Sequence, residues 1–443
     1  MSRPQRALPA RIGLVLTMGV VGACASTGAA GNEQDDVASV ASTVAPQPTT
    51  LPVATNTTVP AAAPQSTTSP RPTTTGPATT VPATTVPATT VRATTVPATT
   101  STTSPVKRAD WAVFDYALAD RLIGGGDQAA SVAVAVDGKI VHRSAFGSRV
   151  PGERAHPADR FRIASISKAM ASAATLRLVE AGKLKLDQPA LALVAKSLNV
   201  PVVDPAANTV TVRQLLGHKS GIGSFEFELL YAGSNSCEHA ARIALSESLV
   251  GKPGKSYRYS NMNYCLIGLV LEAVTGQPYE TVIRKQVLDP VGAGAMRVAG
   301  TRDRSKRSVL HVTSPGRNYM DTLGASGSWI SSASDVVRFA DSLDPAKAGW
   351  HPVSNRTLAL MKAPVTKRHK RGRPRLSWYG LGLVVFSDGS YGHTGTLENT
   401  HAMVVVRPDG VTWAVLVSGE NPWETSDLRT MVDNALFAAL APR

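Results

Sequence analysis

The chain has 443 residues, of which 46 are Lys or Arg and 32 are Asp or Glu, so the formal net charge is +14. This length could hold two or three average domains, but the first quarter has too few large apolar residues to bury a core, which excludes a folded domain there. The positive charge favours association with anionic surfaces, but it does not indicate which reaction the protein catalyses. The sequence has no CxxC motif, no HExxH motif and no cluster of His and Cys, so neither a metal nor a cofactor is expected.

Residues 1–23 have the order of an export signal. Three arginines precede the apolar run 12–21, which is too short to span a bilayer, and small residues lie directly before Cys24. The simplest interpretation is a signal peptide followed by an incidental cysteine. The arrangement also resembles the lipobox of bacterial lipoproteins, whose cysteine is acylated. This resemblance implies a lipoprotein signal peptide, lipidation of Cys24 and an anchor on the extracytoplasmic side of a bacterial cell membrane.

Residues 24–108 are expected to be a disordered spacer rich in Thr, Pro and Ala. The unit Val-Pro-Ala-Thr-Thr begins at Val81, Val86 and Val96, and nothing in this stretch can bury a core. Pro-rich chain favours extended conformations, so roughly 80 residues at about 3.1 Å each give an upper reach of about 250 Å. This reach suits passage through a cell envelope with contact to the cell wall, and the Thr and Pro content suits O-glycosylation.

The segment 109–443 opens with a hairpin signal. Two β-rich runs, 130–136 and 139–145, flank Asp137-Gly138, a dipeptide that favours a two-residue turn. Two antiparallel strands are therefore predicted at the start of this segment.

The end of the chain repeats this design. Further β-rich runs predict strands at 381–386, 401–406 and 411–417, and a helix is expected to begin about Thr425. The patterns between the two strand groups are mainly helical. Separate hairpin groups would leave apolar faces and edges uncovered, so we expect one α+β domain over 109–443: an antiparallel sheet built from both ends, flanked by helices and carrying a helical insertion.

A helix is predicted over 165–181, because apolar and small residues recur at helical spacing and Gly182 follows as a stop signal. Its first turn holds Ser165 and Lys168, three positions apart and hence on one helical face. One S-x-x-K match is expected by chance in about this length of chain, and Ser104 to Lys107 is such a match. Position separates the two, because only the first opens a buried helix after a β-rich run.

The pair Ser165 and Lys168 suggests nucleophilic chemistry. A serine hydroxyl needs a nearby base, and a lysine serves if its pKa falls by about 3 units from about 10.4, a direction favoured by burial and by the helix dipole. Tyr259 and Asn261 would project to one side of an extended loop, where the phenol can carry a second proton. The simpler interpretations are a helix N-cap beside a surface lysine, and a core tyrosine.

The stretches 165–168, 259–261 and 393–395, in this order, resemble the three motifs of the serine β-lactamase and penicillin-binding protein superfamily. The likeness is to its class C-like branch of β-lactamases, D-amino-acid peptidases and esterases, and segments 211–222 and 327–339 also resemble that branch. The match runs from about residue 115 to 440. It implies a β-lactamase/transpeptidase-like fold.

The resemblance implies a role for each matching residue of the first two motifs. Ser165 would be the acylated nucleophile, and Lys168 and Tyr259 would be a coupled acid-base pair whose protons titrate jointly. Asn261 would hold Lys168 and a substrate amide. His218 is expected to fix a loop rather than to act in catalysis.

The third motif would line the cleft. His393, Thr394 and Gly395 would form a sheet edge, and the backbone N–H groups of Ser165 and Thr396 would form the oxyanion hole. His393 stands where β-lactamases and transpeptidases usually have a lysine that helps to hold a substrate carboxylate, which favours an esterase or a peptidase. The residues from 396 to 398 replace a glycine-rich continuation and so narrow or change the cleft. A packing role for His393 in the strand is the alternative.

Cys237 and Cys265 are the two remaining cysteines. An exported chain meets an oxidising compartment, so we expect them to pair, and closing a loop of about 29 residues would contribute about 3.5 kcal/mol. Two buried free thiols are the alternative.

The stretch 367–375 is strongly basic and partly resembles an AT-hook core. An exported chain does not meet chromosomal DNA, so we expect a solvated loop or a contact with anionic lipid or wall polymer, and no nucleic-acid partner.

Together these patterns predict a lipid-anchored, extracytoplasmic serine hydrolase that forms an acyl-enzyme on Ser165. A small-molecule or peptide acyl substrate is expected, with an esterase activity or a D-amino-acid peptidase or carboxypeptidase activity. The alternatives are a β-lactamase and a catalytically silent cell-envelope binding protein of the same fold. No G-x-S-x-G elbow is present, which disfavours an α/β-hydrolase.

Overall fold

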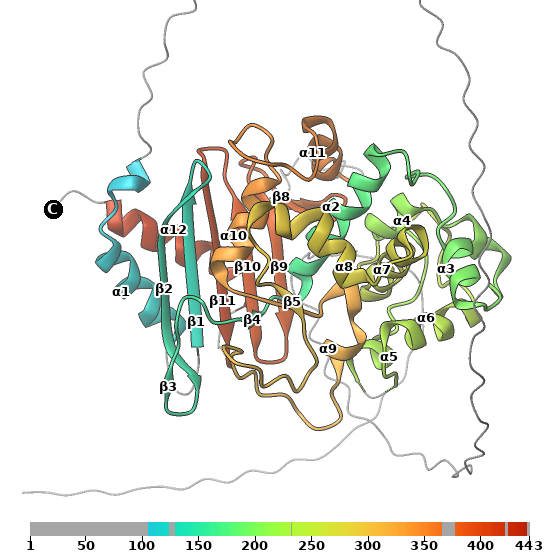
Figure 1. The fold of residues 1–443 in the computed structure, drawn as a ribbon, viewed down its shortest axis with the longest axis horizontal. Coiled ribbons are helices and arrows are strands. Elements are labelled where there is room, and N and C mark those ends of the chain that lie inside the picture. The colour runs from blue at the N-terminus through green and yellow to red at the C-terminus, as the bar shows by residue number, and fades with distance from the viewer. Residues whose placement is uncertain (1–104, 124–128, 232, 366–376, 421–423, 441–443) are drawn as a thin grey trace, which may run out of the picture. The chain divides into compact units, whose positions relative to one another are not determined.

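The computed structural model describes residues 105–123, 129–231, 233–365, 377–420 and 424–440. Within these residues, eight strands form one antiparallel sheet (Figure 1). Their order across the sheet is β3 (Glu153–Arg154), β2 (Lys139–Val150), β1 (Ala129–Val136), β11 (Val411–Ser418), β10 (Thr400–Val406), β9 (Tyr391–Leu397), β8 (Val384–Phe386) and β7 (Ser377–Tyr379). Strands from both ends of the domain meet at its centre, which confirms the predicted α+β architecture.

Strand β1 is buried on both faces, which explains its continuous apolar sequence. Its even-numbered residues from Ala130 to Val136 belong to one apolar core, and Ala129, Ala133 and Ala135 belong to another on the opposite face. Asp137 and Gly138 both adopt positive φ and turn the chain into β2, as the hairpin signal predicted.

Two helices from opposite ends of the domain, α1 (Trp111–Leu122) and α12 (Asp427–Leu440), pack together beside this sheet (Figure 1). The N–H of Asp110 donates to the carbonyl oxygen of Ala439 and ties the two ends together. Pro105–Arg108 forms a 3-10 helix, and Val106 is buried in the same core. The folded part therefore includes Pro105–Arg108, which precede the expected domain start at residue 109.

On the other face, α10 (Ala333–Ser342) lies directly against the central strands, and α2 (Ser167–Glu180) packs on α7 (Asn261–Thr275) within the larger core. The remaining α-helices of the described residues are α3 (Leu191–Leu198), α4 (Val212–Leu216), α5 (Glu226–Leu230), α6 (Cys237–Ser246), α8 (Tyr279–Ile283), α9 (Tyr319–Thr322) and α11 (Asn355–Lys362).

A second, small sheet leads into the start of α2. It consists of β4 (Phe161–Arg162), β6 (Trp329–Ser331) and β5 (Arg297–Val298). The buried guanidinium of Arg162 donates hydrogen bonds to three uncharged oxygen atoms: the carbonyl oxygen of Thr301, Oγ1 of Thr313 and Oη of Tyr319. These bonds hold β4 in place three residues before Ser165.

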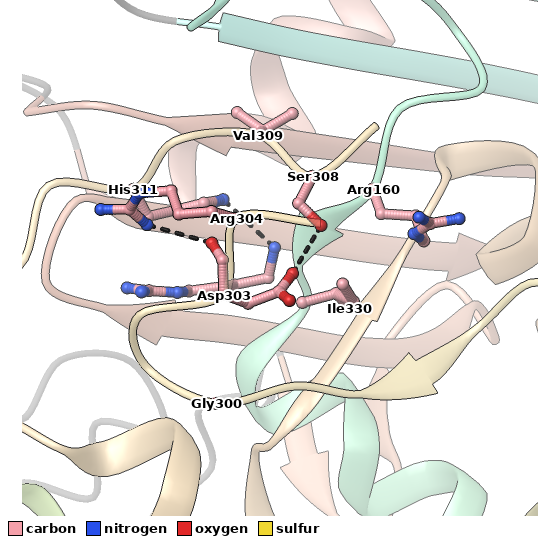
Figure 2. Close-up of a pocket in the computed structure, with 9 residues that line it drawn as sticks. Arg160, Gly300, Asp303, Arg304, Ser308, Val309, His311 and Ile330 are labelled. Atoms are coloured by element: carbon pink, nitrogen blue, oxygen red, sulfur yellow. Dashed lines mark hydrogen bonds between the residues drawn. The ribbon is translucent and has the colours of Figure 1, made fainter. Parts of the chain in front are cut away.

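A small cavity lies beside β4 and β6 (Figure 2). Ser308 directs its hydroxyl to Asp303 at a distance of 2.6 Å, and His311 Nε2 accepts the backbone N–H of Arg162. Hydrogen bonds thus hold both the backbone and the side chain of Arg162, and together they give β4 a defined position.

No helix among the described residues is long and apolar enough to cross a membrane. Nor do three or more His, Cys, Asp or Glu side chains gather as a metal site anywhere in the described ranges.

Candidate active site

Ser165 lies in one turn of 3-10 helix, Ala164–Ile166, and the α-helix itself begins at Ser167, later than the sequence predicts. The turn is entered through Ala164, whose φ of 45° is unfavourable for a residue with a Cβ atom. Ser167 Oγ donates to the carbonyl oxygen of Ala164 at 2.6 Å and supports this conformation. Ser165 is partly exposed, while Ile166 and Lys168 are fully buried. The turn thus presents one accessible hydroxyl at a buried helix start.

Lys168 is surrounded by oxygen atoms. Its Nζ lies 2.8 Å from Ser165 Oγ, 2.8 Å from Asn261 Oδ1 and 2.8 Å from the carbonyl oxygen of Ser326. Burial lowers the pKa of Lys168 well below its ordinary value, because a charged ammonium is poorly solvated in the protein interior. The buried site therefore disfavours the charged ammonium relative to solvent.

Tyr259 faces the same lysine. Nζ of Lys168 lies 4.9 Å from the centroid of the Tyr259 ring, and Asn261 begins α7 two residues later. Burial raises the pKa of Tyr259 above its ordinary value, and a hydrogen bond with Ser165 opposes this change. Tyr259 therefore keeps its proton at neutral pH, while Lys168 loses its extra proton more readily than a lysine in solvent.

Strand β9 brings the third motif against the serine turn. A Cβ atom on Gly395 would collide with the carbonyl oxygen of Ile163 and lie 3.2 Å from Cβ of Ala164. Only glycine allows this approach. Since Ser165 and Thr396 each follow a residue in this contact, their backbone N–H groups lie at the same junction of β9 and η2 (Ala164–Ile166).

His393 is buried and neutral. Its Nδ1 lies 2.6 Å from the carbonyl oxygen of Thr394, so Nδ1 carries the proton and donates. Nε2 then accepts from the hydroxyl of Tyr379 at 3.3 Å. Burial and the nearby Lys168 lower the pKa of His393 to about 3, although the bond to Thr394 opposes them. His393 supplies no positive charge at neutral pH.

The sheet edge expected at 393–395 needs refinement, because β9 is followed by β8 and β7 in the sheet. Pairing of β8 with β9 ends at Gly392, however. From His393 onward, the described strands pair with β9 only on the β10 side. Thr394 is half-buried on this stretch, and Thr396 is exposed with its hydroxyl 2.7 Å from that of Thr425.

Two parts of the site were not predicted from the sequence. The carbonyl oxygen of Ser326 bonds Lys168, and a backbone acceptor leaves no signal in residue identity. Tyr379 orients His393 from β7, a strand that was not predicted. The segment 327–339, which resembles the class C-like branch, begins directly after Ser326, but this resemblance did not predict that the carbonyl oxygen of Ser326 binds Lys168.

The structure joins Cys237 of α6 and Cys265 of α7 by a disulfide bond, with the two Cα atoms 5.6 Å apart. The bond braces the helix that begins with Asn261. Cys24 and the basic stretch 367–375 lie outside the described residues.

The family model described as Beta-lactamase matches residues 117–436, and the chain therefore belongs to the beta-lactamase family, a family of serine hydrolases. Protein flp of Staphylococcus aureus (strain COL) is 26% identical over 293 residues, which cover 63% of this chain and 57% of that protein. The chain thus spans little more than half the length of this relative.

Two other proteins are similar to the chain over most of its length. Penicillin-binding protein 4 of Amycolatopsis lactamdurans is 29% identical over 312 residues, covering 66% of this chain and 80% of that protein. The solved structure of a D-stereospecific amidohydrolase from Streptomyces sp. has a TM-score of 0.56 and 25% identity, and the match covers 74% of this chain and 98% of that one. Together with the family model, these similarities confirm the resemblance to the serine β-lactamase and penicillin-binding protein superfamily and the β-lactamase/transpeptidase-like fold.

Proposed function

We propose that the protein hydrolyses an ester or a D-amino-acid amide or peptide through an acyl-enzyme on Ser165. The observation that carries this proposal is the position of Lys168 Nζ between three oxygen atoms, each 2.8 Å away. A neutral amine has two N–H bonds and one lone pair. Asn261 Oδ1 and the Ser326 carbonyl can only accept, so they take the two N–H bonds and the lone pair is left for the hydroxyl of Ser165.

This geometry supports the first half of the reaction. Ser165 Oγ attacks the substrate carbonyl while its proton passes to Lys168 Nζ, and the carbonyl oxygen gains the negative charge. The backbone N–H groups of Ser165 and Thr396, held together by Gly395, are suited to stabilise that charge. When the tetrahedral intermediate collapses, the bond to the leaving group breaks.

The proton balance assigns the remaining steps. Tyr259 holds its proton and shares a hydrogen bond with Ser165, so it is placed to protonate the leaving amine or alkoxide and to recover its proton from Lys168. Water then attacks the acyl-enzyme with the same groups acting in reverse, which releases the acid and restores Ser165.

The substrate class follows from the neutral third motif. With its pKa lowered to about 3, His393 is no fixed cation for a substrate carboxylate. This favours esters, amides and peptides without an essential carboxylate over β-lactams. The D-stereospecific amidohydrolase from Streptomyces sp., similar along most of its length, supports the same class.

Active-site labelling tests the nucleophile. The purified protein is treated with a fluorescent fluorophosphonate and then offered an ester, a D-amino-acid amide and a β-lactam. Wild type should gain one adduct and hydrolyse the ester or the amide, and Ser165→Ala should do neither. Ser167→Ala is the matched control, because it removes a buried hydroxyl bonded to Ala164 and leaves the nucleophile.

Three outcomes would contradict the proposal. Equal labelling of wild type and Ser165→Ala would refute Ser165 as the nucleophile. Turnover of the β-lactam alone would make the protein a β-lactamase. Binding of all three compounds without turnover, unchanged in Ser165→Ala, would make it a silent binding protein.

We also propose that the chain is anchored through acylated Cys24 to the extracytoplasmic face of a bacterial cell membrane and reaches toward the cell wall. The order of arginines, apolar run and small residues before Cys24 supports this. Cells fed an alkyne fatty acid should label the wild-type chain and not Cys24→Ala. An unlabelled wild type, or equal labelling of both, would refute the anchor.

A further inference from the structure

His218 lies just after α4 and is 1% exposed. Its backbone adopts a φ of 54°, and its ring is surrounded by tyrosines. Ring centroids lie 4.3 Å away for Tyr259, 4.9 Å for Tyr379 and 5.2 Å for Tyr264. This imidazole therefore packs directly on the tyrosine that contacts Ser165 and Lys168.

The hydrogen bonds of His218 define its tautomer. The backbone N–H of Ser260 donates to Nδ1 at 3.2 Å, and Nδ2 of Asn263 lies 3.1 Å from the same atom. Nδ1 therefore carries no proton, and the neutral ring is protonated on Nε2. Burial lowers the pKa of His218 well below its ordinary value, which agrees with a neutral ring.

The other edge of the ring is not satisfied. Among the described residues, Nε2 of His218 is buried without a hydrogen-bond partner. A buried N–H of this kind is unfavourable, and an apolar side chain of similar size would avoid the penalty. The feature that distinguishes histidine from such a side chain here is the acceptor on Nδ1.

That acceptor holds a segment of the candidate active site. Ser260 stands between Tyr259 and Asn261, whose side chains contact Lys168 from two sides. The N–H of Arg258 also donates to the carbonyl oxygen of His218 at 2.8 Å. The segment is thus fixed to His218 at two points, one through backbone and one through the imidazole.

We propose that His218 is a positioning residue for acylation, which uses Nδ1 of its neutral, Nε2-protonated ring to hold Ser260 and so aligns Tyr259 and Asn261 on Lys168. The proposal rests on the proposed function, because the aligned groups act on Ser165. Positions in a reacting site matter strongly, and an error of about 1 Å costs on the order of 100-fold in rate.

Two substitutions of His218 separate positioning from packing. In His218→Asn, the amide oxygen can take the place of Nδ1 and accept from Ser260. In His218→Leu, the space is filled but no acceptor remains. We expect the acylation rate constant of His218→Leu with a fluorophosphonate to fall about 100-fold, with little change in the half-saturating concentration, and His218→Asn to stay within about 10-fold of wild type. If His218→Leu does not fold, His218→Gln replaces it, because its oxygen reaches the Nε2 position instead.

A spectroscopic measurement tests the tautomer without any turnover. A long-range 1H–15N spectrum of the full chain should show His218 neutral with its proton on Nε2. A proton on Nδ1, or a charged ring at pH 7, would overturn the proposal.

The outcomes also separate this proposal from the proposed function. Normal labelling of wild type together with equal rates for His218→Leu and His218→Asn would overturn the role of His218 alone. A wild type that is not labelled at all would refute the proposed function, and the acylation role of His218 with it.

Discussion

Gly395 touches the backbone of Ile163 so closely that no larger residue fits between β9 and the serine turn. Replacing it by alanine must push the strand or the turn aside, because the atoms in contact are backbone atoms and cannot rotate away. We expect Gly395→Ala to lose about 1–3 kcal/mol of unfolding free energy and to label with fluorophosphonate at least about 100-fold more slowly than wild type. Urea denaturation and labelling kinetics measure both effects. Near-normal labelling would show that the backbone N–H groups of Ser165 and Thr396 do not need the close contact between Gly395 and Ile163.

Lys168→Met tests the buried base. The variant keeps a side chain of similar length, so it should fold, and acylation at pH 7 should fall by about 100-fold to 10,000-fold. Since burial lowers the pKa of Lys168, the unfolded wild type binds this proton more readily than the folded wild type does.

A stability measurement gives the sign of that pKa change. As pH falls below about 10.4, the ordinary pKa of lysine, Lys168 of the unfolded chain takes up a proton, and this destabilises the folded wild type. Methionine at this position takes up no proton and so removes the effect. The stability of Lys168→Met relative to wild type should therefore be higher at pH 7 than at pH 9.5 by urea denaturation. A difference that does not change with pH would contradict a lowered pKa.

His393 should make the protein sensitive to acid. Its pKa of about 3 in the folded protein lies below the value of about 6.5 in an unfolded chain. The stability contributed by the neutral ring is complete above about pH 6.5 and is lost as pH falls toward 3, because only the unfolded chain takes up the proton. In His393→Gln, the slope of unfolding free energy against pH should be smaller by about 1.4 kcal/mol per unit in this window. Parallel slopes from pH 4 to 6 would rule out a buried neutral His393.

The same neutral ring predicts selectivity. Two esters that differ only in a carboxylate or a carboxamide on the leaving group should have kcat/KM values within about threefold of each other. A charged partner in the third motif would instead contribute about 1.5–3 kcal/mol, or 10-fold to 100-fold. A preference of this size for the carboxylate would mean that a cation elsewhere in the chain binds it.

The disulfide between Cys237 and Cys265 closes a loop with a sequence separation of 28. The native protein should have neither of these thiols available to an alkylating reagent. The double variant Cys237→Ala/Cys265→Ala should lose about 3.5 kcal/mol of unfolding free energy. Under reducing conditions that open the bond, wild type and the double variant should become alike. If the unfolding free energies of reduced wild type and the double variant still differ, the destabilisation comes from lost packing and not from the disulfide, because Cys265 is completely buried.

Local signals predicted much of the sheet. Asp137-Gly138 and the β-rich runs beside it indicated β1 and β2, and the run 411–417 matches β11. Helix α1 was not predicted, because its burial depends on packing against α12 at the other end of the chain. Strand β9 was indicated only by the family resemblance, since its glycines and threonines give a weak strand signal.

In the candidate site, too, some features follow from the local sequence and others depend on long-range packing. Ser165 and Lys168 are three positions apart, so one helical turn brings them together and the sequence suffices. The approach of Asn261 depends on α7 packing against α2, which no local pattern encodes. The hydrogen bond from Tyr379 to Nε2 of His393 depends on the pairing of β7 with β8, and the second acceptor of Lys168 is a main-chain carbonyl. Long-range packing therefore fixes the parts that the sequence alone left open.

The pairing of β1 with β11 sets when the domain can fold. Their register runs from Ala129 opposite Ser418 to Val136 opposite Val411, at the middle of the sheet. A chain emerging from a ribosome cannot complete that centre until residue 418 has followed. Up to that moment β1 offers an open, apolar edge to other chains, so holding the chain apart from its copies during synthesis protects it from aggregation.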